Sequence, residues 1–361
     1  MNRRKPMVIN GMTIGQGRRP WVVAEMSGNH QQSLQRALAI VDAAADAGAD
    51  ALKIQTYTAD SITLDCDRPE FMIDDPDGPW HGRSLYELYE EAGTPRDWHP
   101  AIFQRCRERG LVAFSSPFDV AAVDFLESLA VPCYKIASFE IVDIPLIRRV
   151  ARTGKPVILS TGMATLEEIT EAVTALRSVN SDLPVVLLKC TSAYPAPADA
   201  MNLNTIRHLR ETFDVDVGLS DHTLGIAVPV AAVALGACVI EKHLTLSRAE
   251  GGPDATFSLE PPEFRRMVDA VQCAWQALGG LHYGAGEAER ANRRFRKSVF
   301  AVQDIAAGER FTVENLRVIR PGNGLHPRHY EDLLGKTASC SIARGTPMTW
   351  DLVNPEPVTA Y

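Results

Sequence analysis

The fold is decided by residues 215–243, which read VDVGLSDHTLGIAVPVAAVALGACVIEKH. Two apolar runs, at 215–222 and 238–243, flank one helix-length segment, and each run ends in a histidine. Because strands joined by such a crossover lie parallel and side by side, their C-terminal ends meet at one edge of a sheet. The pattern predicts neighbouring strands that bring His222 and His243 within reach of one metal ion.

The same pattern of an apolar run with a polar end occurs six more times along the chain. The runs are WVVAE (21–25), ALKIQT (51–56), LVAFSS (111–116), CYKIAS (133–138), PVILST (156–161) and VVLLKCT (185–191). Eight β-branched runs that alternate with helical segments predict an α/β fold, a closed (β/α)8 TIM barrel, although an open doubly wound sheet stays possible.

Helical segments between the runs support the barrel. Leu34, Leu38, Val41 and Ala45 recur at helical spacing, and Gly48 follows where a left-handed cap would end the helix. Glycines also precede later runs, at Gly110, Gly154 and Gly236.

Length and charge limit the function classes. The 361 residues exceed one barrel, so we expect a second, smaller domain. The net charge of -8 argues against nucleic acid or an anionic membrane as the main partner. With no long apolar run, no signal peptide and seven cysteines without a C-x-x-C pair, we expect a cytoplasmic protein with reduced thiols.

The composition changes after Gly279, and we expect three segments. Residues 1–285 would form the barrel, 286–297 a charge-rich linker, and 298–361 a small β-rich domain. Two similar units, GERFTVENL (308–316) and GTPMTWDLV (345–353), indicate an internal duplication in the small domain. A domain of this size is marginally stable alone, so we expect it to dock on a larger surface.

Active sites of parallel barrels lie at the C-terminal strand ends, where several polar residues fall. Lys53 and Lys135 lie within apolar strands, and a buried ammonium needs an anion. The anion could be a substrate group, or the lysines could form internal salt bridges with Glu25, Glu140 or Glu241.

Hydroxyl residues also end strands: Ser138, Ser160, Thr161 and Ser220. Near the backbone N–H groups of helix starts they suit phosphate or carboxylate oxygens. Each alone is more typical of an ordinary helix N-cap, but their convergence with two lysines favours an anion site.

The two histidines predict an open metal site. The alternative is that 221–223 (DHT) caps the next helix and His243 is a core residue. Two strong ligands leave positions for water and substrate, which suits a Lewis acid that polarises a carbonyl. Oxygen ligands at the remaining positions favour Mn²⁺ or Mg²⁺.

Several strings, in this order along the chain, resemble the sialic acid synthase family. They are AEMSGNH (24–30), ALKIQTYTAD (51–60), FSSPFD (114–119), YKIASFE (134–140), STGMAT (160–165), LLKCTSAYPAP (187–197), GLSDHTLG (218–225), EKHLTL (241–246) and, in the tail, IRPGNGL (319–325). The resemblance covers almost the whole chain, and the tail is similar to that family's antifreeze-like (SAF) domain.

The resemblance implies condensation of phosphoenolpyruvate with an open-chain amino sugar, giving a nonulosonic acid and phosphate. It implies that Lys53, Lys135, Ser138, Ser160, Ser192 and Ser220 hold phosphoenolpyruvate, although family members proper have asparagine at the position of Ser192. Gln55, Glu140 and Tyr194 would hold the sugar, His222 and His243 the metal, and Glu25 would position a proton or hydroxyl.

The family also implies a homodimer in which a tail arginine, matched here by Arg320, reaches the sugar bound by the partner subunit. The string LSRAEGGPDATFSLEP (246–261) is most similar to the branch that makes pseudaminic acid. Neuraminate and legionaminate synthesis are the alternative within the family.

Three other function classes stay open. A metal-dependent barrel hydrolase would explain the histidines but not the lysines within strands. A synthase that uses a sugar phosphate should show extra arginines at the strand ends. A sugar-binding protein without catalysis would need neither the metal nor the lysines. Phosphate release from phosphoenolpyruvate, with and without amino sugar and metal, separates them.

Overall fold

The computed structural model describes residues 7–76, 78 and 80–355 of the chain. It divides into two compact units, Met1–Gly279 and Gly280–Tyr361. The predicted domain limits at 285/286 and 297/298 stay predictions, and the predicted ends at 1–6 and 356–361 lie outside the described residues.

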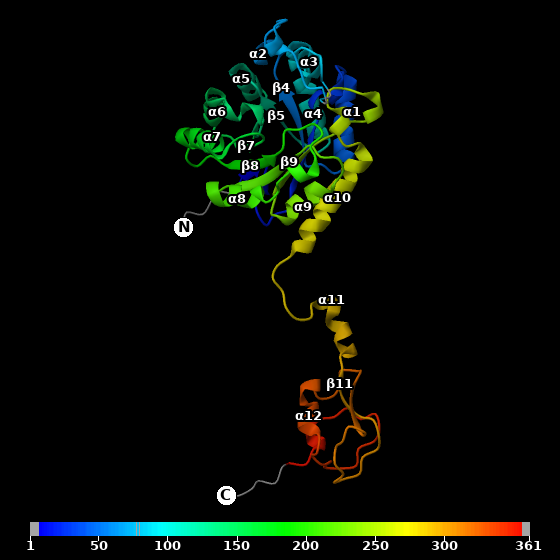
Figure 1. Cartoon of the computed structure of the whole chain (residues 1–361). Helices are drawn as coiled ribbons and strands as arrows, with labels where there is room; N and C mark the ends of the chain where they lie inside the picture. Colours follow the sequence, from blue (N-terminus) through cyan, green and yellow to red (C-terminus); the bar gives the residue numbers. More distant parts are fainter. Residues whose placement is uncertain (1–6, 77, 79, 356–361) are drawn as a thin grey trace. The chain divides into compact units, whose positions relative to one another are not determined.

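The first unit is a closed barrel of eight parallel strands, which confirms the predicted fold (Figure 1). The hydrogen-bonded order around the barrel is β10-β3-β4-β5-β6-β7-β8-β9. The strands are β3 (Trp21–Glu25), β4 (Ala51–Thr56), β5 (Val112–Pro117), β6 (Tyr134–Ile136), β7 (Val157–Ser160), β8 (Val185–Cys190), β9 (Asp216–Asp221) and β10 (Val239–His243). Each lies within or one residue beyond a predicted apolar run.

Helices follow the strands and cover the outside of the barrel (Figure 1). They are α1 (Leu34–Asp46), α4 (His99–Glu108), α5 (Val120–Ser128), α6 (Ile144–Ala151), α7 (Leu166–Val179), α8 (Thr205–Phe213), α9 (Ala227–Ala234) and α10 (Pro261–Leu278). Gly48 has a φ of +85°, so the predicted left-handed turn after α1 is confirmed.

The residues at helical spacing in α1 all belong to the packed side of the helix, at different depths. Val41 is buried, whereas Leu34, Leu38 and Ala45 are partly buried and pack against the core. The most buried positions are Ala37, Ile40, Val41 and Ala44, two alanines and two β-branched residues. Small side chains let the helix approach the barrel closely, while the larger leucines lie at the edge of the contact.

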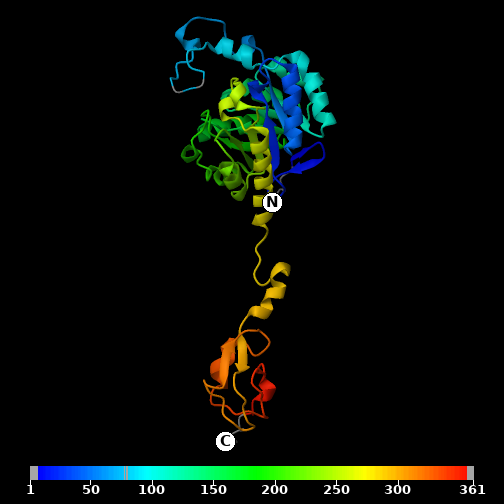
Figure 2. The same cartoon turned by 90° about the vertical axis from the view of Figure 1, so that its right-hand side faces the viewer.

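The N-terminal ends of the barrel strands are covered by a hairpin. Its strands β1 (Met7–Ile9) and β2 (Met12–Ile14) pair antiparallel, and Met7, Ile9 and Ile14 are buried in one apolar cluster with barrel residues such as Trp21 and Phe114. Figure 2 shows the hairpin in dark blue near one end of the barrel. The interior of the barrel is therefore packed at this end.

A long insertion lies at the opposite end, between β4 and α4. It contains α2 (Ala59–Ile62), a loop, and α3 (Leu85–Ala92), which begins with a capping box formed by Ser84 and Glu87. Figure 2 shows the light-blue part of this segment extending beyond the barrel strands.

The second unit is small and internally duplicated. It contains α11 (Glu287–Arg290), the paired strands β11 (Ser298–Ala301) and β12 (Leu316–Ile319), and α12 (Tyr330–Leu333). Ile305 and Ile342, at matching positions of the two repeats, exchange both backbone hydrogen bonds at 2.8 Å. The matching Gly308 and Gly345 both have positive φ, so the duplication seen in the sequence extends to the structure.

The seven cysteines are free thiols, and Cys106, Cys133, Cys190 and Cys238 are buried. Among the described residues, no helix combines the length and apolar character needed to cross a membrane.

Candidate active site

A cavity of about 590 Å³ opens at the C-terminal ends of the barrel strands. Its position follows from the alternation of side chains along each strand. In β10, Val239, Glu241 and His243 face the barrel interior, with Val239 in the packed layer and the other two lining the cavity. The polar end of each apolar run therefore faces one shared space.

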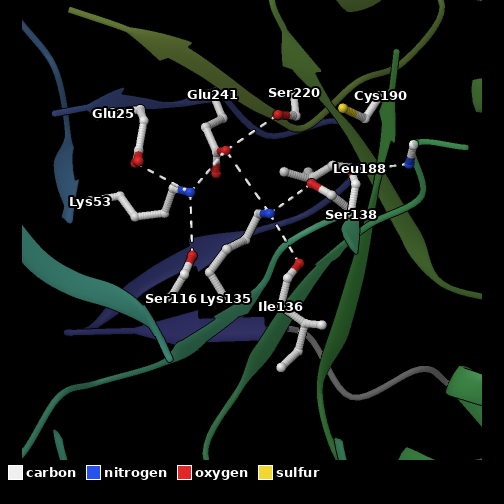
Figure 3. Close-up of polar contacts among 12 residues, drawn as sticks. Glu25, Lys53, Ser116, Lys135, Ile136, Ser138, Leu188, Cys190, Ser220 and Glu241 are labelled. Carbon is white, nitrogen blue, oxygen red and sulfur yellow. Dashed lines mark hydrogen bonds and ion pairs between the residues drawn. The ribbon is translucent and has the colours of Figure 1, made fainter. Parts of the chain in front are cut away.

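Four charged side chains form a buried cluster on the floor of this cavity (Figure 3). Lys53 Nζ lies 3.2 Å from Glu25 Oε2 and 3.2 Å from Glu241 Oε1. Lys135 Nζ lies 4.0 Å from the same Glu241 oxygen. Two ammonium groups and two carboxylates thus share a site with almost no solvent exposure.

Burial and mutual attraction set the protonation of the cluster. Burial raises the pKa of Glu25, and burial also lowers the pKa of Lys135 to about 8. Burial acts against the charged forms of Lys53 and Glu241 too, but the opposite charges outweigh it, so the Lys53 pKa is raised and the Glu241 pKa is lowered. Of the two ammonium groups in the cluster, Lys135 is therefore the less compensated by neighbouring carboxylates.

The structure contains some of the salt bridges of the alternative interpretation. Lys53 pairs with Glu25 and Glu241, whereas Glu140 Oε2 has no hydrogen-bond partner among the described residues. Both lysines line the cavity as well. Ion pairing and substrate binding are compatible for a lysine in this position, and the anion-binding role stays a prediction.

The predicted hydroxyl groups differ in where they point. Ser160 Oγ accepts a hydrogen bond from Lys135 Nζ at 2.7 Å, and Ser138 Oγ accepts one from the Gly162 N–H at 3.1 Å. Ser220 Oγ donates to Glu241 Oε1 at 3.3 Å. These three serines line the cavity.

Ser192 and Thr161 do not line the cavity. Ser192 is half-buried, and its hydroxyl lies close to Gly162. A Cβ atom added to Gly162 would lie 2.2 Å from the Ser192 hydroxyl oxygen, so that hydroxyl would have to move. Thr161 follows Ser160 and points away, because successive side chains of a strand alternate, and its hydroxyl donates to the Leu188 carbonyl at 3.0 Å.

The two histidines meet as predicted from the strand pair. Their ring centroids are 5.3 Å apart, and the rings of Tyr194 and Phe257 pack against them. His222 Nδ1 lies 3.0 Å from the Thr191 carbonyl oxygen, so Nδ1 carries a proton, and in the neutral ring Nε2 is left as an acceptor. Burial lowers the pKa of His243 well below its ordinary value, and the neutral ring is the form that binds a metal.

These residues fit a metal with an open coordination sphere. His243 Nδ1 is buried and has no hydrogen-bond partner among the described residues. In residues 7–76, 78 and 80–355, no group of three or more His, Cys, Asp or Glu side chains is placed to hold an ion. The protein therefore offers two imidazoles, and substrate or water oxygens would have to supply the other ligands.

A buried ion pair outside the cavity joins the two strands that carry the histidines. Lys242 Nζ lies 2.6 Å from Asp221 Oδ2, and neither side chain is exposed. The two residues are partners in the β9–β10 register, and each directly precedes a histidine in the chain. The pair therefore holds the backbone from which both imidazoles project.

The predicted sugar-binding residues Gln55, Glu140 and Tyr194 all line the cavity. Gln55 Nε2 donates to Glu25 Oε1 at 3.0 Å and to Ser27 Oγ at 2.8 Å, so it orients the Glu25 carboxylate. Burial raises the pKa of Glu140 to about 7, so this carboxyl can hold a proton at neutral pH. Arg320 is exposed and lies in the second unit, after β12, and its role stays a prediction.

Several cavity residues were not predicted from the sequence: Ser27, Tyr57 and Asp254. They lie in loops or in a single 3-10 turn, where neither period 2 nor period 3.6 gives a signal. Asp254 is positioned by a contact between distant segments, because its Oδ2 accepts the Gly28 N–H at 3.2 Å. The turn-rich GGPD string at 251–254 was the available hint.

Comparison with known proteins identifies the class to which this barrel and its site belong. Residues 40–283 match the model of the NeuB family, and residues 296–354 match the SAF domain. The chain belongs to the NeuB family. The resemblance to sialic acid synthases and the predicted SAF domain are thereby confirmed.

Individual relatives are similar over most of their length. The pseudaminic acid synthase of Campylobacter jejuni is 48% identical over 326 residues, 90% of this chain and 94% of that protein. The pseudaminic acid synthase of Helicobacter pylori is 43% identical and covers 92% of this chain and 97% of its own. An N,N'-diacetyllegionaminic acid synthase of C. jejuni is 36% identical, covering 88% of this chain and 95% of its own.

Solved structures agree with the fold. The crystal structure of N-acetylneuraminic acid (sialic acid) synthetase from Leptospira borgpetersenii in complex with citrate has a TM-score of 0.71 at 30% identity. The match covers 80% of this chain and 95% of that one.

Proposed function

We propose that this chain is a transferase that condenses phosphoenolpyruvate with 2,4-diacetamido-2,4,6-trideoxy-L-altropyranose, reacting in its open-chain form, and water. The products are pseudaminic acid and phosphate. The observation that carries the proposal is one cavity that gathers two lysines and two histidines, in a chain 48% identical to a pseudaminic acid synthase over 90% of its length. Legionaminate or neuraminate synthesis is the alternative, and it is less supported because the legionaminic acid relative is 36% identical.

In this proposal the charge cluster binds phosphoenolpyruvate. Lys53 and Lys135 would hold its phosphate and carboxylate groups, together with the hydroxyls of Ser138, Ser160 and Ser220. Incoming anions would take over part of the role of Glu241, which faces both ammonium groups. The Gly162 N–H donates to Ser138 Oγ at 3.1 Å and so helps to orient that hydroxyl.

A divalent ion, Mn²⁺ or Mg²⁺, would be held by His222 and His243 and would polarise the aldehyde of the sugar. C3 of the enolpyruvate forms a bond to the aldehyde carbon, water adds at C2, and the C2–O bond to phosphate breaks. Glu25, held by Gln55, lines the same cavity as the two histidines and would position a proton or hydroxyl. Tyr194 and Glu140 would hold the sugar on the outer side of the histidines.

We also propose a homodimer in which Arg320 of the partner subunit reaches the sugar. Large apolar side chains on loops after three barrel strands support a covering partner. Phe139 and Val142 are each 58% exposed, Met163 is 61% exposed, and Leu224 is 64% exposed. The cytoplasmic location stays a prediction.

The proposed function is tested by measuring phosphate release from phosphoenolpyruvate with each candidate acceptor in parallel. The diacetamido-trideoxy sugar of the L-altro series should have the highest kcat/KM, and release should require both the acceptor and a divalent metal. Faster turnover of N-acetylmannosamine would overturn the acceptor assignment. Release without any acceptor would overturn the condensation.

A further inference from the structure

The active-site cavity has an apolar part as well as its charged floor. We define the apolar wall as the aliphatic and phenyl side chains that the β4–α4 insertion and its neighbours contribute to the cavity: Ile62, Ile73, Leu85, Leu88 and Phe118. Ser61 and the hydroxyl-bearing rings of Tyr57 and Tyr89 line the cavity beside this wall. The insertion lies beyond the C-terminal strand ends, on the side of the cavity away from the packed hairpin (Figure 2).

The apolar wall is held in place by contacts within the insertion. The Tyr57 ring packs edge-on against Tyr89 at 5.8 Å and against Phe118 at 5.0 Å. Ile73 is fixed through its backbone, because its N–H donates to the Arg83 carbonyl at 2.9 Å and its carbonyl accepts the Gly82 N–H at 2.9 Å. The wall is therefore formed before a substrate binds.

Trp80 closes the gap between the insertion and the loop after β10. Its Nε1–H donates to the Pro253 carbonyl at 2.8 Å, and its ring lies 5.5 Å from the ring of Tyr194. Tyr194 in turn packs against His222 at 4.5 Å. His222, Tyr194 and Trp80 thus form a continuous side of the cavity, along which a substrate with its reacting carbon near His222 could reach the apolar wall.

The chemistry of the wall indicates which part of the acceptor it contacts. Most carbons of a hexose carry a hydroxyl, and a hydroxyl that faces Ile73, Leu85 or Leu88 would lose its water without gaining a hydrogen-bond partner from them. A methyl group in the same place gains from burial. With C1 at the metal-binding histidines, C6 is the carbon farthest along the chain, and in a 6-deoxy sugar C6 is a methyl.

We infer that the apolar wall determines specificity at C6: it receives the methyl group of a 6-deoxy acceptor and disfavours the 6-hydroxy analogue. This inference rests on the proposed function. It goes further by assigning the discrimination to the inserted segment rather than to the residues that bind phosphoenolpyruvate or metal.

The test replaces an apolar side chain of the wall by a polar side chain of similar size. The variants are Leu85→Asn, which is nearly isosteric, and Ile73→Thr, which keeps the branched shape and adds a hydroxyl. The control is Met72→Asn, because Met72 is adjacent to Ile73 but is 39% exposed and does not line the cavity. Each protein is assayed for phosphate release with the 6-deoxy acceptor and with its 6-hydroxy counterpart.

The wild-type protein should prefer the 6-deoxy acceptor by roughly 10- to 200-fold in kcat/KM, the range expected for one apolar group in a fitted pocket. In both wall variants this preference should fall about tenfold or more, with the Michaelis constant for phosphoenolpyruvate unchanged. The Met72→Asn control should keep the wild-type preference.

The outcomes separate the inference from the function on which it rests. If the wild type releases phosphate with neither sugar, the proposed function is wrong and the inference falls with it. If the wild type is active but has no preference at C6, or if the two wall variants keep the preference, the function stands and the wall is not the determinant. Circular dichroism identifies a variant that fails to fold, and the other wall variant then decides.

Discussion

Replacing Lys135 by methionine tests the anion-binding role of the charge cluster. The side chain is 1% exposed, and its ammonium lies 2.7 Å from Ser160 Oγ and 3.0 Å from the Ile136 carbonyl oxygen. A hydrogen bond to a charged group contributes about 1.5–3 kcal/mol. Losing one such contact to phosphoenolpyruvate should raise its Michaelis constant roughly 10- to 150-fold, because about 1.4 kcal/mol corresponds to a factor of ten. The Michaelis constant of the sugar should change far less.

A second lysine within a strand provides a matched control. Lys189 lies in β8, and its Nζ donates to the Cys190 carbonyl at 2.6 Å and to Thr191 Oγ1 at 3.2 Å, outside the cavity. Lys189→Met should leave both Michaelis constants unchanged. Steady-state phosphate release, with each substrate varied in turn, measures the difference. An equal rise for both substrates in Lys135→Met would refute the reasoning and point to general damage of the barrel.

The pH dependence of the same assay gives an independent check. Burial lowers the pKa of Lys135 to about 8 from its ordinary value of 10.5, so the ammonium loses its proton as the pH rises through 8. The wild-type Michaelis constant for phosphoenolpyruvate should therefore rise above pH 8, and the methionine variant should lack this rise. A rise in pH affects the stability of the fold in the opposite direction from substrate binding. Since the folded pKa lies below the unfolded one, Lys135 destabilises the fold below pH 8, and this destabilisation is relieved between pH 8 and 10.5.

Three further predictions concern the metal, the strand pair and the dimer. His222→Ala and His243→Ala should each abolish phosphate release while keeping the wild-type circular dichroism spectrum, and full activity in either variant or after exhaustive chelation would exclude the Lewis acid. Lys242→Met should lower the free energy of unfolding in urea by about 3–5 kcal/mol, because it leaves the Asp221 carboxylate buried and unpaired. The double variant with Asp221→Asn should recover part of that loss, and a larger loss would contradict the pairing argument. Mixing inactive His243→Ala and Arg320→Ala chains and allowing the subunits to exchange should restore activity, because one site of the mixed dimer then carries neither change. A mixture that stays inactive despite proven exchange would contradict shared sites.

The barrel could be predicted because its signals are local. Parallel strands buried on both faces must be apolar throughout, so each run marked a strand directly. The paired histidines and the lysines followed from one further rule, that the C-terminal ends of parallel strands meet. The alternation of side chains within β10 also explains why Glu241, named from the sequence as a possible ion-pair partner of the lysines, faces the cavity: it lies between the interior residues Val239 and His243.

The sugar end of the site could not be predicted in the same way. Ser27 and Asp254 reach the cavity because the backbone N–H of Gly28 bonds to a carboxylate 226 residues away, and local patterns carry no trace of such a contact. Trp80 depends on a bond to the Pro253 carbonyl, which joins two loops from different strands. Loop paths are set by these few long-range hydrogen bonds rather than by periodicity.

The hairpin at the N-terminal ends of the strands has a kinetic consequence. Met7, Ile9 and Ile14 close that end of the barrel with packed side chains, so both substrates enter from the side of the insertion. The lysines, the apolar wall and Trp80 line one cavity, and the insertion that carries the wall extends beyond the strand ends (Figure 2). A sugar bound as proposed would stand in the path of phosphoenolpyruvate. We therefore expect sequential turnover, in which the smaller, anionic substrate enters first and phosphate leaves after the newly formed nine-carbon acid.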